Sequence, residues 1–90
     1  MCELEVSKVF KKDLRLLRFS DKHYARYILY LGYLLQGEPL PPEARDHSLQ
    51  GEWCAYREFH ISGDLLVIYK RVGNKVYLAR IGTHAQLFKA

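Results

Sequence analysis

Histidines are the residues of this sequence whose type and spacing are best suited to chemistry. His23 lies near the start of a predicted helix, whereas His47, His60 and His84 lie at the predicted ends or edges of strands. The ends of neighbouring antiparallel strands can converge, and functional sites are commonly built on the loops found there. We therefore treat these last three histidines as the candidate reactive group.

Convergent histidines beside basic residues suit one reaction in particular, the cleavage of RNA. RNA carries its own nucleophile, the 2′-hydroxyl, so a base must remove that proton while an acid protonates the departing 5′-oxygen. Imidazole, with an unperturbed pKa of about 6.5, serves as either group near neutral pH, and such help contributes about 10²–10⁴-fold in rate. Arginine or lysine at the crowded phosphate adds electrostatic stabilisation. This chemistry needs no metal.

Each of these residues also has a competing interpretation. A histidine at a strand end is usually a surface or hydrogen-bonded residue. A zinc site built from His47, His60 and His84 is an alternative, although their spacings match no compact ligand motif. Three further candidates have plain structural interpretations: Asp64 as a turn residue, Arg80 as a solvated charge and Phe88 as a packed ring.

Length and charge limit the class of protein. Ninety residues predict a single domain, residues 1–90, because a chain this short has no room for a second core. Lys and Arg number 14 against 10 Asp and Glu, which gives a net charge of +4 and a pI near 9.2. This excess suits an acidic partner, either nucleic acid or an acidic protein, although many ordinary domains reach the same charge.

Cysteine usage and hydropathy predict a soluble protein in a reducing compartment. Cys2 and Cys54 form no CxxC motif; two cysteines exclude a four-cysteine zinc site and favour reduced thiols in the cytoplasm. The acidic N-terminus contains no apolar signal region. The most apolar stretch, residues 24–35, contains Arg26 and is shorter than the about 20 residues that a membrane-spanning helix needs. We expect no membrane association.

The N-terminal half is predicted to form a strand and two helices. Residues 3–6 alternate between polar and apolar, as in a short strand. Ser7 is suited to cap a helix whose apolar face consists of Phe10, Leu14 and Leu17. A second helix is predicted to begin at Ser20 and Asp21 and to stop at Gly37, with a buried stripe formed by Tyr24, Tyr27, Ile28, Leu31, Leu34 and Leu35. These helices should form an antiparallel hairpin that needs another surface to cover it.

The C-terminal half reads as strands after a proline-rich loop at residues 38–45. The alternating run 56–61, the continuous apolar run 65–69 and the run 76–81 predict three strands, the second of them central. Gly73 and Asn74 are suited to a tight hairpin turn between the last two. A strand, two helices and then three or four strands predict an α+β fold, a small antiparallel sheet with helices on one face.

The strand at residues 56–61 is predicted to present different side chains to its two faces. Phe59 and Ile61 belong to the core face. Because successive side chains alternate, Tyr56, Glu58 and His60 should project to the opposite face, which the helices leave uncovered. Residue types and spacing thus predict a basic α+β domain with a candidate histidine site.

Two sequence motifs resemble those of a known toxin family. Residues 46–53 read DHSLQGEW and resemble the DHxLxGxW segment of YafQ-type toxins, while residues 82–88 read GTHAQLF and are similar to the family's GTHxxLF ending. The strand containing His60, then Asp64, lie between them with the spacing intact. The resemblance covers residues 46–88, almost half of the chain, whereas the N-terminal half agrees only in layout.

The resemblance implies the RelE fold, a small twisted antiparallel sheet packed against an N-terminal helical hairpin. It also implies an mRNA interferase that needs no cofactor, works on translated messages in the ribosome, and is held inactive by a cognate antitoxin. We expect that antitoxin to be acidic and encoded immediately upstream.

The family's site residues are carried over by motif. They are His47, His60, Asp64 and His84 as catalytic residues, with Phe88 as the terminal aromatic residue at the substrate. We assign His84 to protonation of the leaving oxygen. We assign His60 and His47, together with Asp64, to orientation or activation of the 2′-hydroxyl. Which histidine is the acid and which is the base stays open. Candidate phosphate contacts are Arg80 and, more weakly, Lys70.

The sequence departs from the family at one position, and two alternative functions stay open. Leu65 stands where YafQ has a tryptophan, and because leucine cannot stack on a base as an indole does, we expect an altered or looser base preference. A ParE-like inhibitor of DNA gyrase would share the fold but would not need three gathered histidines. A basic binding module without turnover is the other alternative.

Overall fold

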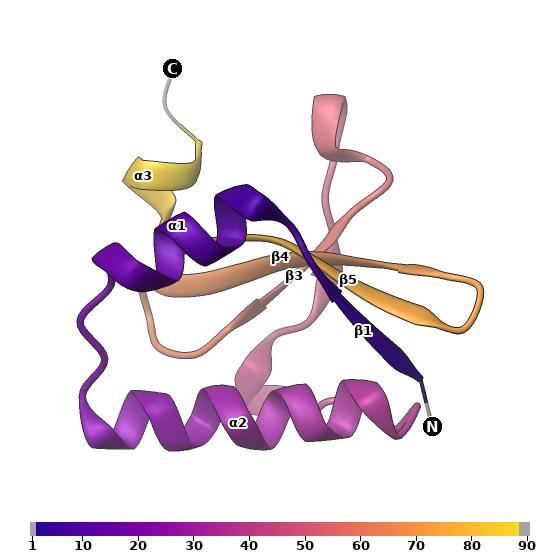
Figure 1. Cartoon of the computed structure of the whole chain (residues 1–90), viewed down its shortest axis with the longest axis horizontal. Coiled ribbons are helices and arrows are strands. Elements are labelled where there is room, and N and C mark those ends of the chain that lie inside the picture. The colour runs from indigo at the N-terminus through magenta and orange to yellow at the C-terminus, as the bar shows by residue number, and fades with distance from the viewer. Residues whose placement is uncertain (1, 89–90) are drawn as a thin grey trace.

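The computed structural model describes residues 2–88 as one five-stranded sheet with helices packed against it (Figure 1). The strands are β1 (Glu3–Val6), β2 (His47–Ser48), β3 (Arg57–His60), β4 (Leu65–Val72) and β5 (Lys75–Thr83); the helices are α1 (Lys8–Leu16), α2 (Asp21–Leu35) and α3 (His84–Leu87), with short 3-10 turns η1 (Pro42–Ala44) and η2 (Gly51–Trp53). This arrangement confirms the predicted α+β class. Within residues 2–88, no helix combines the length and apolar character needed to cross a bilayer.

The sheet has the strand order β1-β5-β4-β3-β2, so the continuous apolar run of β4 lies at its centre, as predicted. β3, β4 and β5 are antiparallel neighbours. Gly73 and Asn74 form the two-residue turn between Val72 and Lys75, and Gly73 has φ +58°, a left-handed conformation that glycine adopts without steric cost. β1 pairs with β5 in parallel. This pairing was not predicted, because a four-residue alternating pattern does not reveal which strand lies beside it.

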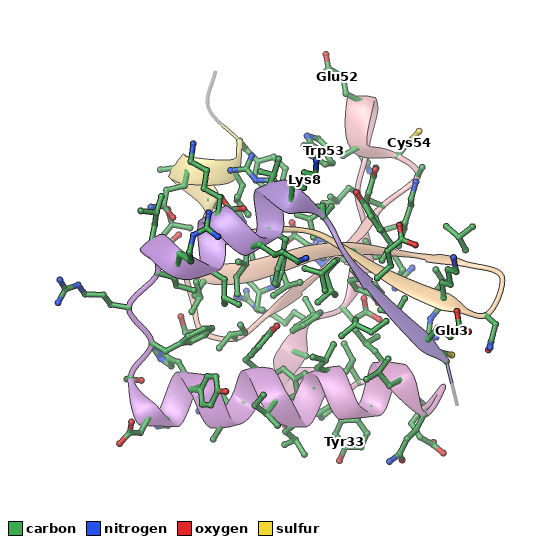
Figure 2. The ribbon with its side chains drawn as sticks, viewed as in Figure 1. Glu3, Lys8, Tyr33, Glu52, Trp53 and Cys54 are labelled. Carbon is green, nitrogen blue, oxygen red and sulfur yellow. The ribbon has the colours of Figure 1, made fainter. Side chains whose placement is uncertain are left out.

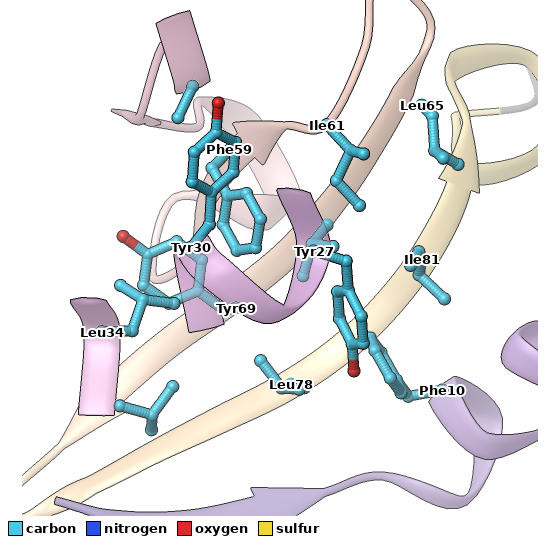
Figure 3. Close-up of a cluster of buried hydrophobic side chains, with 13 residues drawn as sticks. Phe10, Tyr27, Tyr30, Leu34, Phe59, Ile61, Leu65, Tyr69, Leu78 and Ile81 are labelled. Carbon is cyan, nitrogen blue, oxygen red and sulfur yellow. The ribbon is translucent and has the colours of Figure 1, made fainter. Parts of the chain in front are cut away.

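The main core lies between α2 and one face of the sheet (Figure 3). Tyr27, Tyr30 and Leu34 of α2 are buried against side chains that include Phe59 and Tyr69. The predicted stripe of this helix was partly wrong: Tyr24 and Ile28 are exposed, whereas Tyr30 is buried. Apolar residues occur on most sides of α2, so the sequence pattern did not determine which side faces the sheet.

α1 lies along β5 beyond the point where β1 ends (Figure 1). Ser7 caps α1 by accepting a hydrogen bond from Phe10 N at 2.9 Å, as predicted, and its hydroxyl donates to the carbonyl of Ala79 at 2.8 Å. Asp13 accepts a hydrogen bond from Ile81 N at 3.2 Å. α1 therefore satisfies backbone groups of β5 that would otherwise lie on an open edge.

Candidate active site on the face opposite α2

The face of the sheet opposite α2 carries a second, smaller apolar cluster. Its buried members are Leu66, Ile68, Ala79 and Leu87, and partly buried side chains packed against them are Leu49, Trp53, Tyr56, Tyr77 and Phe88. In Figure 2 the Trp53 side chain lies on the inner side of η2, toward α3, whereas Glu52 and Cys54 point away from it. This face is therefore lined with aromatic side chains. The prediction that helices leave it uncovered was partly wrong, because Leu87 of α3 packs on it.

Two buried polar residues of β3 lie on this face. Glu58 is 4% exposed and His60 5% exposed, and their position confirms the alternation predicted for this strand. Charged side chains are rarely buried unless other polar groups contact them. Burial of Glu58 therefore indicates that its carboxylate has partners within the site.

The three candidate histidines converge on that carboxylate. The Oε2 atom of Glu58 lies 3.2 Å from His47 Nε2, 3.4 Å from His60 Nε2 and 3.9 Å from His84 Nε2. The rings form a row in which the His47 and His60 centroids are 6.0 Å apart and those of His60 and His84 are 5.5 Å apart. His47 and His84 are about half exposed and flank the buried pair.

Different elements deliver the outer two histidines. His47 in β2 is the direct cross-strand partner of Glu58. His84 is the first residue of α3, and Thr83 caps that helix in a capping box with Gln86. A β-carbon at Gly82 would lie 2.7 Å from Gln86 Oε1. Glycine at this position therefore leaves room for the Gln86 oxygen that accepts the Thr83 N–H at the start of α3.

A hydrogen bond orients the His47 ring, and a carboxylate lies beside the His84 ring. His47 Nδ1 lies 2.7 Å from the carbonyl oxygen of Arg45, which accepts its proton and leaves Nε2 directed at Glu58. His84 Nδ1 lies 3.5 Å from Asp64 Oδ1, and the backbone N–H of His84 donates to the same oxygen at 3.4 Å. Asp64 is therefore placed beside His84 and not beside His47 or His60, with which the prediction had grouped it.

The surroundings of His60 lower the pKa of its ring and so favour the uncharged form. Burial is the largest cause of the lowering of its pKa below 6.5, and the positive charge of Arg45 acts in the same direction; Glu58 opposes this shift only in part. Nδ1 of His60 is buried and has no hydrogen-bond partner among the described residues. His60 is thus suited to hold Glu58 through Nε2–H and not to exchange protons with solvent.

Glu58 is the site residue that sequence reasoning missed. Alternation had placed it on the same face as His60, and this shared face was the available signal. The sequence analysis gave Glu58 no role, because the pattern does not show that β2 and α3 would cover it with histidines.

The structure brings the predicted substrate contacts together only in part. Phe88 lies beside the histidines, with its ring centroid 5.9 Å from that of His84. Arg80 is bound to Asp13 through Nε at 2.7 Å and Nη2 at 3.1 Å, a contact that raises the pKa of the guanidinium. Lys70 lies farther along the sheet, against Tyr56 and Tyr77.

Leu65 is 8% exposed and belongs to the core on the α2 side of the sheet. The expectation that this residue would alter base stacking is therefore not supported by its position. Its side chain faces away from the histidines.

A metal-binding arrangement coincides with part of the site. Glu58, His60 and His84 each offer one ligand atom within 4.8 Å of the others. Imidazole nitrogens with a carboxylate oxygen suit Zn²⁺ or Cu²⁺, so these residues fit a transition metal. The sequence had suggested a different group, the three histidines together, because Glu58 was not recognised.

Comparison with known proteins agrees with this fold and identifies the family. Residues 2–89 match the family model described as "Bacterial toxin of type II toxin-antitoxin system, YafQ". The chain is 36% identical over 88 residues to the mRNA interferase toxin YafQ of Escherichia coli K12, covering 96% of this chain and 95% of that protein.

Solved structures of toxins also resemble this chain in fold. The YafQ toxin in the E. coli DinJ–YafQ complex has a TM-score of 0.85 at 34% identity, over 98% of this chain and 99% of that one. A metal-bound toxin from Helicobacter pylori has a TM-score of 0.83 at 36% identity, over 98% and 100% of the two chains. The fold and these matches define a RelE-like toxin domain. The chain belongs to the YafQ family of type II toxin-antitoxin toxins.

Proposed function

We propose that this protein is an mRNA interferase, an endoribonuclease that cuts messages during translation in the cytoplasm and is neutralised by a cognate antitoxin. The observation that carries the proposal is the pair of exposed imidazoles, His47 and His84, on either side of the buried Glu58 carboxylate. The name of the E. coli relative, an mRNA interferase toxin, supports the same activity. The DinJ–YafQ complex supports an antitoxin partner.

In the proposed reaction His47 is the base. Its Nδ1 proton is held by the Arg45 carbonyl, so Nε2 presents a lone pair that takes the proton of the 2′-hydroxyl. The 2′-oxygen then bonds to phosphorus. The negative Glu58 carboxylate lies 3.2 Å from Nε2 and stabilises the imidazolium that forms. This assignment selects His47 as the proton acceptor, with His60 holding Glu58 in place.

His84 is the proposed acid. As the phosphorus bond to the 5′-oxygen breaks, His84 Nε2 gives that oxygen a proton, so a 2′,3′-cyclic phosphate and a free 5′-hydroxyl result. Asp64 lies next to Nδ1 and orients the ring. Phe88 is placed to stack on a neighbouring base. Arg80 can contact a phosphate only if it leaves Asp13.

The central test is induction of the chain in a bacterium, with mapping of new 5′ ends on cellular transcripts. The wild-type protein and a His23→Ala control, altered in α2 away from the site, should cut messages and arrest growth. His84→Ala should lose at least about a hundredfold in cleavage. Equal cleavage by His84→Ala would remove this residue from the mechanism.

Other outcomes of the same experiment identify the alternatives. Supercoiling defects without new 5′ ends would favour a gyrase inhibitor, and harmless expression would favour a binding module. Co-expression of an acidic open reading frame from immediately upstream should restore growth if the partner is a cognate antitoxin.

We further propose that cleavage does not require a metal. An ion held by Glu58, His60 and His84 would act as a Lewis acid on the phosphate. It would also occupy a nitrogen atom of His84, the acid in the proposed mechanism. Cleavage should therefore persist in excess chelator; loss of cleavage on chelation, restored by zinc, would contradict metal independence.

A further inference from the structure

A series of aromatic contacts leads away from the histidines across the face opposite α2. The ring centroid of Phe88 lies 5.9 Å from that of His84 and 6.3 Å from that of Trp53, and the Trp53 centroid lies 5.2 Å from that of Tyr56. Phe88 directly follows α3, Trp53 belongs to η2, and Tyr56 is the residue before β3. The candidate active site is therefore continuous, ring by ring, with the other end of the sheet.

That end of the sheet contains a hollow of about 370 Å³ whose lining combines aromatic rings and ammonium groups. Nζ of Lys70 lies 4.9 Å from the ring centroid of Tyr56 and 5.5 Å from that of Tyr77, its cross-strand partner. The residues that line the hollow are Glu5, Tyr56, Lys70, Val72, Lys75 and Tyr77. Because a strand advances roughly 3.3 Å per residue, Tyr56 lies about 13 Å from His60 along its strand.

We propose that this hollow, which we call the distal subsite, binds a further nucleotide of the same single-stranded RNA that reaches the histidines. The inference rests on the proposed function for the identity of that strand. Tyrosine rings provide surfaces on which a base stacks, and lysine ammonium groups beside them attract the phosphates on either side. The Trp53 and Phe88 rings provide a stacking surface between the distal subsite and the reacting bond.

The mixture of residue types favours RNA over an acidic peptide. An acidic peptide would need only the ammonium groups, whereas the rings that hold Lys70 and continue toward His84 match the π-face that every base has. Glu5 is the one unfavourable group in the lining, and it is bound to Lys75 at 3.4 Å. Both members of this pair are about half exposed, so a phosphate can displace Glu5 from Lys75 at little cost.

The test compares the binding of two single-stranded RNAs to the full chain carrying His84→Ala, a background meant to keep the RNA intact. A dinucleotide can occupy only the histidine site, whereas a ten-nucleotide RNA can also reach the distal subsite. Tyr77→Leu and Lys70→Gln should each weaken binding of the longer RNA about tenfold, because one stacked base or one phosphate contact is lost. Neither should change binding of the dinucleotide.

Two controls separate a local effect from misfolding or loss of charge. Tyr77→Phe keeps the ring and should bind the longer RNA like the parent, while Lys22→Gln, an exposed change on α2, should also have no effect. Unchanged binding of the longer RNA by both Tyr77→Leu and Lys70→Gln would overturn the proposal. So would loss of antitoxin binding with RNA binding intact, which would make the hollow a protein-docking surface.

Failure of the proposed function has a different signature. In that case the wild-type chain would produce no new 5′ ends in cells, while the length-dependent binding of RNA by the distal subsite could still be measured.

Discussion

At the level of residues, a single carboxylate oxygen lies at the centre of the candidate site. Glu58 Oε2 is close to Nε2 of all three site histidines, yet only His47 and His84 are open to a substrate. His60 is enclosed, and burial lowers its pKa. The buried His60 ring holds the Glu58 carboxylate between the exposed rings of His47 and His84. These two rings are thereby kept at fixed positions, which favours the proposed proton transfers at one phosphodiester.

The titration of His60 tests this arrangement. Followed by NMR in the presence of a chelator, its ring should protonate at a pH below about 6.5. Because Glu58 raises the pKa of His60, Glu58→Gln should move the midpoint lower still. A midpoint at or above 6.5 in the wild-type protein would contradict the enclosed, uncharged ring.

The same shift affects stability in a defined direction. The folded pKa of His60 lies below its unfolded value, so its contribution to the free energy of unfolding is complete above about pH 6.5 and is lost as the pH falls toward the folded pKa. The decrease in Tm between pH 7 and pH 5 should therefore be smaller in His60→Gln than in the wild-type protein.

At the level of elements, the contact between α1 and β5 replaces a missing strand neighbour. β1 pairs with β5 only as far as Leu78. Beyond that residue, the Asp13 carboxylate accepts hydrogen bonds from Ile81 N and from the Arg80 guanidinium. One helix residue thus stabilises the edge of the strand that leads to His84.

Removal of this contact should weaken the fold more than an ordinary surface change. Asp13→Ala leaves the Ile81 amide and the Arg80 side chain without their partner. Since both are part-buried, we expect the free energy of unfolding to decrease by about 1–2 kcal/mol. Urea denaturation measures the change, with the exposed Glu52→Ala as control. Equal midpoints for the two variants would show that the contact contributes nothing to stability.

At the level of the whole molecule, the chain has a net positive charge, and the candidate active site is open to solvent. The net charge of +4 favours association with polyanions. Lys70 and Lys75 lie at the end of the aromatic series, so part of this charge is located where the proposed RNA strand would pass. Arg45, whose charge acts on His60, supplies another cation near the histidines.

Binding of RNA should accordingly weaken with salt in a predictable way. If three phosphates are contacted, the logarithm of the association constant should fall against the logarithm of salt concentration with a slope of about −2. Titration of a ten-nucleotide RNA into the His84→Ala protein at several salt concentrations gives this slope. A slope near zero would mean that phosphate contacts are absent and that the net charge serves another partner.

Local sequence determined the elements and most of the candidate site. Alternation in residues 56–61 placed His60 opposite the core, Ser7 and Ser20 marked the helix starts, and Gly73-Asn74 marked the hairpin. The motifs around His47 and His84 identified the toxin family, which the comparisons confirmed. These features were predictable because they depend on residues close together in the chain.

Contacts between distant segments were decided only by the tertiary structure. Glu58 became the shared partner of three histidines because β2 pairs with β3 and α3 folds back over them. Arg80 is bound to Asp13 because α1 lies along β5. No periodic pattern encodes which surfaces meet across such sequence separations. The sequence by itself therefore determined which residues could react, while packing of the strands and helices decided which charges hold them in place.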